Sequence, residues 1–268
     1  MTTARLPTYF ISHGGGPWPW MKEQLGGAYD QLEAALARMP ADLGRTPRAV
    51  LMLSAHWEAP QFTVQTHPAP PMLYDYGGFP DFTYRIQYPA PGAPDVATRV
   101  RELLAGAGID SQEDAARGFD HGMFAPMAVI YPKADVPVLQ LSLKRGLVPA
   151  DHLALGRALA PLRDEGILIV GSGLSYHNLR AFGPAARAPS AAFDAWLEST
   201  LALADAAARS TTLAAWERAP AARLAHPREE HLLPLMVALG AAEADAATRV
   251  YHEREFFGGI TVSSYRFG

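Results

Sequence analysis

Three histidines follow short apolar runs, near the places where buried strands are expected to end. His13 follows TYFIS, His56 follows AVLMLSA, and His177 follows ILIVGSGLSY. In open parallel sheets, ligands bind in the crevice beyond the carboxyl ends of the strands, so we expect these imidazoles to meet at one edge. One such histidine would be an ordinary loop residue, whereas three at matched positions indicate a functional site.

Two further histidines stand near expected helix starts. His121 lies in GFDHG, before the apolar segment 123–131, and His231 lies in HPREEHLLP, on or just before a late helix. Neutral imidazole binds Fe, Zn, Cu and Ni. Two histidines with a carboxylate are typical of ferrous oxygenases, and three histidines are typical of some zinc enzymes. A histidine outside the ligand set would serve as an acid or base.

The composition excludes several other chemistries. The chain has no cysteine, which rules out disulfides, zinc–thiolate sites and a cysteine nucleophile. With 23 Lys and Arg against 27 Asp and Glu, the net charge of −4 argues against nucleic-acid or anionic-membrane partners. No apolar segment reaches the roughly 18 residues of a membrane span, and no secretory signal is visible, so we expect a cytoplasmic protein. The glycines of GGG at 14–16 and GSG at 171–173 fit neither a phosphate loop nor a nucleophile elbow.

The apolar runs alternate with longer helical patterns. Strands are predicted over residues 8–12, 49–54, 62–66, 136–143, 167–170 and 261–264, and helices over 94–104, 151–163, 190–208 and 228–239. This alternation predicts an α/β fold: a single domain with a mostly parallel central sheet flanked by helices and a metal site at the carboxyl ends of the strands. The aromatic stretch 68–92 is rich in Pro and Gly and is interpreted as an ordered loop over the site.

An ordered series of motifs resembles a known family. ISHGGGP, SAHWE, YDYGGFP, YPAPG, GFDHG, PVLQLSL, GSGLSYHNLR, HPREEHLLPLMVALGAA and SSYRF follow one another from about residue 8 to the C-terminus. Together they resemble the class III extradiol ring-cleavage dioxygenases, in the 4,5-DOPA dioxygenase-like branch with the LigB-type catalytic fold. The resemblance implies one catalytic domain over residues 1–268.

The resemblance also implies roles for the five histidines. His13, His56 and His231 match the positions of the metal ligands, although Glu230 beside His231 is an alternative third ligand. His177 matches the catalytic acid/base, and whether it also coordinates the metal is left open. His121 matches a histidine that contacts substrate or dioxygen.

The implied reaction is the opening of a catechol by O2. Fe(II) is expected for turnover, and Zn(II) is an alternative resident metal. The substrate is expected to be a small aromatic diol, DOPA-like or related, lying against Tyr74, Tyr76 and Phe79. Arg85, Lys144 and Arg180 are candidates for a substrate carboxylate. A zinc hydrolase, or a silent zinc-binding protein on the same scaffold, is the alternative function, and the sequence predicts no oligomeric state.

Overall fold

A six-stranded sheet forms the centre of the molecule in the computed structural model, which describes residues 5–268. Its order is β6 (Val138–Gln140), β2 (Ala49–Ser54), β8 (Ile167–Gly173), β1 (Thr8–Ser12), β10 (Ile260–Phe267) and β9 (Ala247–Phe256). The first four strands run parallel, and β10 and β9 add an antiparallel hairpin at the edge. The expected single α/β domain with a mostly parallel sheet is confirmed.

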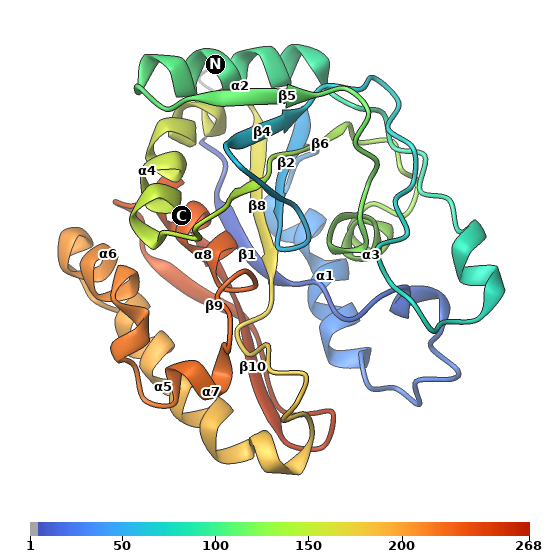
Figure 1. Ribbon diagram of the computed structural model, residues 1–268, viewed down its shortest axis with the longest axis vertical. Helices are drawn as coiled ribbons and strands as arrows, with labels where there is room; N and C mark the ends of the chain where they lie inside the picture. Colours follow the sequence, from blue (N-terminus) through green and yellow to red (C-terminus); the bar gives the residue numbers. More distant parts are fainter. Residues whose placement is uncertain (1–4) are drawn as a thin grey trace.

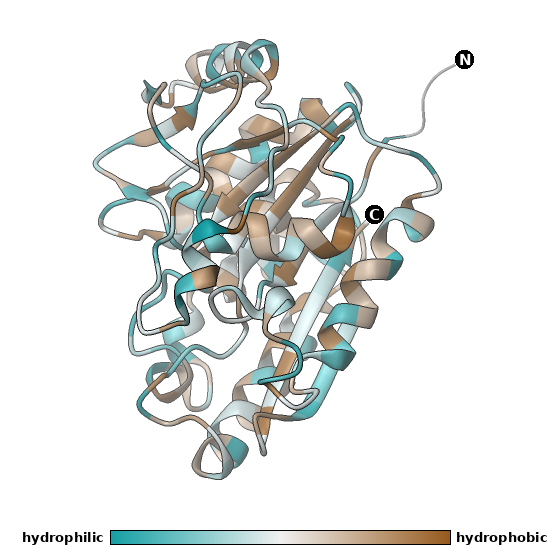
Figure 2. Cartoon of the chain, turned by 90° about the vertical axis from the view of Figure 1, so that its right-hand side faces the viewer, coloured by the Kyte–Doolittle hydropathy of each residue, from teal (hydrophilic) through white to brown (hydrophobic). Residues whose placement is uncertain are grey.

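Helices cover both faces of the parallel strands (Figure 1). One face packs against α1 (Asp30–Leu43) and α3 (His121–Ile130), and the other against α2 (Pro94–Gly106), α4 (Pro149–Leu159) and α8 (Leu233–Ala241). In β2, Val50 and Met52 join the first core, whereas Leu51 and Leu53 join the second. This alternation explains why the strand is apolar throughout, as Figure 2 shows for the central strands.

Smaller elements complete the domain. Helix α5 (Arg187–Leu201) lies against the β9–β10 hairpin, with α6 (Ala206–Ala214) and α7 (Ala222–Ala225) beside it. Two short parallel pairs join β3 (Glu58–Ala59) to β7 (Leu143–Lys144) and β4 (Phe62–Gln65) to β5 (Ser111–Asp114). Within residues 5–268, none of the helices combines the length and apolar composition needed to cross a bilayer.

Several element boundaries differ from the sequence-based prediction. The strand expected over 136–143 is two strands, because the chain leaves β2 after Gln140 and Ser142 bonds instead to Thr63 of β4. The helix expected over 190–208 ends at Leu201, and Asp205 caps a new helix, α6, by accepting the backbone N–H of Ala208. The late helix begins at Leu233 rather than at 228, and β9 was not predicted.

Candidate metal centre

Five histidines from five segments gather at the carboxyl edge of the sheet. His13 follows β1, His56 follows β2 and His177 follows β8, and these three strands are neighbours. His121 opens α3, and His231 lies just before α8. The ring centroid of His13 lies 4.9 Å from that of His56 and 5.2 Å from that of His231. The rings of His56 and His121 are 4.0 Å apart, and those of His177 and His231 stack at 3.3 Å.

One ring nitrogen of His13 faces one ring nitrogen of His56. Their Nε2 atoms are 3.1 Å apart. The Nδ1 atom of His13 lies 3.0 Å from the Ser172 hydroxyl, which itself donates to a backbone carbonyl, so the ring donates from Nδ1. The Nδ1 atom of His56 lies 3.4 Å from an oxygen of Asp75, whose negative charge favours a proton there. Two lone pairs therefore point at one another, an arrangement that a bound cation would satisfy.

Glu230 contacts both rings of the stacked pair, His177 and His231. Its Oε1 atom lies 3.0 Å from Nδ1 of His231 and 3.2 Å from Nδ1 of His177. A hydrogen on each Nδ1, facing this carboxylate, would leave both Nε2 atoms available as ligands or acceptors. Histidines that bind metals almost always donate their other ring N–H to a carboxylate, a carbonyl or water, and these contacts follow that pattern. The Oε2 atom of Glu230 is buried without a hydrogen bond, and Arg228 lies 3.6 Å from it.

A second carboxylate, Asp75, is shared between His121 and His56. Its Oδ1 atom accepts the backbone N–H of His121 at 2.9 Å and the ring Nδ1–H at 2.9 Å. Asp75 thereby satisfies a free N–H at the start of α3, where a negative charge is also favoured by the helix dipole. Asp120, the residue before α3, does not cap the helix with its side chain. It accepts hydrogen bonds from Ser54, Arg117 and Gln140 instead.

The electrostatics of the centre suit a divalent cation. Burial, together with the neighbouring imidazoles, lowers the pKa of His13 and His231 well below 6.5. Burial and the nearby His121 lower the pKa of His56 to about 4. Burial alone would raise the pKa of Asp75 and Glu230. Contacts with His121 and His56 outweigh it and lower the pKa of Asp75, and contacts with His177, the backbone and Arg228 do the same for Glu230. At neutral pH, three uncharged imidazoles therefore face two carboxylates.

Glycines in β8 allow the chain carrying His231 to approach the sheet. A Cβ atom on Gly173 would lie 2.1 Å from the carbonyl oxygen of His231, and one on Gly171 would lie 2.2 Å from that of Pro234. The backbone N–H of Leu174 donates to the same His231 carbonyl at 3.1 Å. This contact needs the bare backbone of glycine, which explains the GSG sequence at the end of the strand.

The aromatic loop (residues 68–92) lies against the histidines. The ring of Tyr76 is 5.9 Å from that of His121 and 5.3 Å from that of Phe79, and a Cβ atom on Gly16 would touch Phe79. The hydroxyl of Tyr76 donates to the carbonyl of Thr83, and that of Tyr74 to the carbonyl of Ile86, so both are held within the loop. Tyr76 and Phe79 are therefore placed to border a ligand at the centre.

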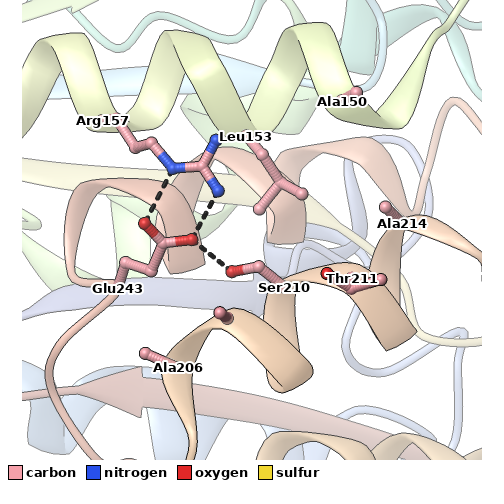
Figure 3. A pocket seen from close by; sticks show the side chains of 9 residues that line it. Ala150, Leu153, Arg157, Ala206, Ser210, Thr211, Ala214 and Glu243 are labelled. Atoms are coloured by element: carbon pink, nitrogen blue, oxygen red, sulfur yellow. Dashed lines mark hydrogen bonds and ion pairs between the residues drawn. The ribbon is translucent and has the colours of Figure 1, made fainter.

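Other predicted positions lie elsewhere or remain surface groups. Lys144 pairs with Asp151 at 2.8 Å, beside a cavity of about 470 Å³ that none of the five histidines lines. Arg85 is exposed, and Arg180 is exposed close in sequence to His177. A second cavity, of about 510 Å³, lies between α4 and α6, where Glu243 contacts Arg157 and Ser210 (Figure 3). None of the five histidines lines this cavity either.

Two sets of three residues bring their possible ligand atoms within 4.8 Å of one another. They are His13, His56 and His121, and His177, Glu230 and His231. The ligand set implied by the family resemblance takes two members from the first set and one from the second, so it stays a prediction. Sequence reasoning missed Asp75 and Ser172. The sequence offered two signals for them: Asp75 stands among the aromatic residues of YDYGGFP, and Ser172 stands between the glycines of GSG.

The comparisons with known proteins agree with one another. The profile of the family described as "Catalytic LigB subunit of aromatic ring-opening dioxygenase" matches residues 7–268. The chain is 40% identical over 272 residues to a 4,5-DOPA dioxygenase extradiol of Beta vulgaris, covering 97% of this chain and 96% of that protein. It is 33% identical to the protein of that name from Escherichia coli (strain K12), with 100% and 97% covered. A crystal structure of an uncharacterized protein from Escherichia coli K12 matches with a TM-score of 0.79 and 29% identity, covering 98% of this chain and 100% of that one.

Proposed function

The chain belongs to the family of catalytic LigB subunits of aromatic ring-opening dioxygenases, and we propose that it opens a DOPA-like catechol beside the diol at one non-haem metal ion. Extradiol dioxygenase function is established at the level of the family, as is the use of an aromatic substrate and O2. The substrate, the metal and the residue roles are our proposal. The named relatives from Beta vulgaris and Escherichia coli support a catechol of the DOPA type.

We assign the metal to His13, His56 and His231. The observation that carries this assignment is the contact that Nδ1 of each ring makes with Ser172, Asp75 or Glu230, which leaves Nε2 of each ring available to a metal ion. Three protein ligands leave coordination positions for a substrate. We propose Fe(II) for turnover, because reaction with O2 transfers electrons and Zn²⁺ has no redox chemistry. When bound, such a metal would lower the pKa of the diol hydroxyls and would allow electrons to pass between the ring and O2.

His177 is proposed as the acid/base. Glu230 lies 3.2 Å from its Nδ1 atom and holds the proton there, which leaves Nε2 free to take a proton from a diol hydroxyl. The stacking of His177 on His231, at 3.3 Å between centroids, keeps this nitrogen beside the proposed metal position. The same histidine can return the proton when the ring opens.

His121 is proposed to contact the substrate or O2. Its Nδ1–H is held by Asp75 at 2.9 Å, so its Nε2 atom is free to accept a hydrogen bond from the bound diol. Tyr76 and Phe79 would form an apolar wall for the aromatic ring of the substrate. We propose that residues 1–268 form one catalytic domain.

Metal analysis combined with an oxygen electrode tests this function. The protein is loaded with Fe²⁺ or Zn²⁺ under argon, and O2 uptake is followed with DOPA, protocatechuate and catechol. We expect O2 uptake and a yellow ring-opened semialdehyde with the Fe²⁺ form alone. His67→Ala is a matched control, because His67 directly precedes the aromatic loop and its ring accepts only the nearby backbone N–H of Ala69 among the described contacts.

A contrary result is specific. No O2 uptake with any of the three diols by iron-loaded protein would refute the proposed reaction. Ester or amide hydrolysis by the Zn²⁺ form would then identify a zinc hydrolase on this scaffold.

A further inference from the structure

Asp75 connects two parts of the molecule that are distant in sequence. It lies in the aromatic loop, between Tyr74 and Tyr76, yet its carboxylate contacts His121 at the start of α3 and His56 after β2. The residue lies at the surface, but its side chain is only 16% exposed because the carboxylate turns towards the two histidines. The loop that borders the ligand position is therefore tied to the histidine cluster through one carboxylate.

The two contacts of Asp75 differ in length. Towards His121, Oδ1 accepts two hydrogen bonds of 2.9 Å. Towards His56, Oδ2 lies 3.4 Å from Nδ1, beyond the usual length of a charged N–H···O bond. The His121 side is thus fully formed, whereas the His56 side has room to shorten.

A metal ion on His56 would act on the longer contact. Withdrawal of electron density from Nε2 makes the Nδ1–H of the ring a stronger donor, and ligating histidines are usually held by such a carboxylate. The loop carries Tyr76 and Phe79 with Asp75, so a tighter contact with Asp75 also steadies the wall of the ligand position. Because energetic coupling is reciprocal, a steadier loop favours metal binding to the same degree.

We propose that Asp75 is a positioning residue that couples metal binding at the histidine cluster to the ordering of the aromatic loop. This inference rests on the proposed metal centre and adds to it a role that neither the ligands nor the acid/base performs. The coupling predicts that the substrate wall is less ordered in metal-free protein, and that removal of Asp75 weakens metal binding without removing a ligand.

Asp75→Asn keeps the shape of the side chain and changes only its charge and hydrogen-bonding groups, so it tests the carboxylate itself. The two donors of His121 require the amide oxygen of Asn on their side, which leaves the amide NH2 facing Nδ1 of His56. That NH2 group needs an acceptor, so the proton of His56 moves to Nε2 and blocks the lone pair. Asp75→Ala removes the acceptor without imposing this tautomer. Asp81→Asn is the matched control, since Asp81 is an exposed carboxylate in the same loop.

The experiment measures Co²⁺ binding and loop exchange, and requires no turnover. Co²⁺ is titrated by its visible absorption, and hydrogen–deuterium exchange of peptides covering 68–92 is compared with and without Co²⁺. We expect metal to slow exchange of the loop in the wild-type protein and in Asp81→Asn. In Asp75→Asn and Asp75→Ala, we expect Co²⁺ affinity to fall about 10–100-fold and the metal-dependent protection to disappear.

Each contrary outcome has a distinct meaning. Equal loop exchange in metal-free and Co²⁺-loaded wild-type protein overturns the coupling, and this measurement does not depend on whether a variant folds. Wild-type Co²⁺ affinity in both Asp75 variants also overturns it, while the proposed metal centre stands. Failure of the wild-type protein to bind Co²⁺ overturns the metal centre and the coupling together.

Discussion

Gly173→Ala should damage both the stability of the fold and the metal centre. The added Cβ atom would lie 2.1 Å from the His231 carbonyl oxygen, well inside van der Waals contact. About 1 Å of movement is needed to relieve this clash, and overpacking of this kind typically destabilises a protein by about 1–3 kcal/mol. The displaced carbonyl also accepts the N–H of Leu174, a hydrogen bond that contributes about 1 kcal/mol.

The two terms together predict a loss of about 2–4 kcal/mol in the free energy of unfolding, or roughly 4–7 °C in Tm for a chain of this size. Because ligand distances must hold to within about 0.2 Å, moving His231 should also weaken metal binding. Thermal unfolding of metal-free protein and Co²⁺ titration measure the two effects. Gly106→Ala is the control: it lies in α2 with open space around the new methyl group and should be neutral or stabilising. Wild-type Tm and metal affinity in Gly173→Ala would refute the argument.

Three further predictions concern protons, ligands and buried charge. His177→Ala should keep its iron while catechol turnover falls about 10²–10⁴-fold, whereas His56→Ala should lose metal and turnover together. Metal analysis and O2 uptake measure the two effects, and iron loss of equal size in both variants would identify His177 as a ligand. Burial lowers the pKa of His152 to about 4, so its contribution to stability is complete above pH 6.5 and is lost as the pH falls towards 4. Urea unfolding across this range should show a decline of roughly 3 kcal/mol from this residue, absent in His152→Gln; parallel curves would contradict it. Asp120→Ala leaves Arg117 unpaired and should destabilise the protein by about 3–5 kcal/mol in the same assay, and a change below 1 kcal/mol would show that the pair is dispensable.

The parts of the fold that could be predicted are those with a strong local pattern. The bounds of β1 and β2 match the prediction because both strands are buried on both faces and have an uninterrupted apolar centre. Strand β9 was missed because it forms the sheet edge, and exposed Arg and Glu residues interrupt its alternation. The late start of α8 was missed because the chain just before it carries His231 close to Gly173, a contact between segments that are distant in sequence.

The same distinction applies to the candidate site. His13, His56 and His177 could be placed together because strand ends meet at one edge of a parallel sheet. Asp75 and Ser172 could not, since each is recognised only by the ring nitrogen it contacts across the fold. The residues on either side of Asp75 or Ser172 in the sequence do not indicate which histidine each contacts.

The wide separation of the five histidines along the chain affects when a metal can bind. His13 precedes the first helix and His231 precedes the last, so no short fragment holds the cluster, unlike the local ligand spacing of a zinc finger. The complete site exists only where β1, β2 and β8 are paired, so we expect that a metal ion does not nucleate folding of this chain. Its binding free energy is added to the native state alone, by about 2.7 kcal/mol when free metal is at 100 times its dissociation constant. Metal uptake is thus a late event in maturation, and metal-free protein should be a folded species able to receive its ion.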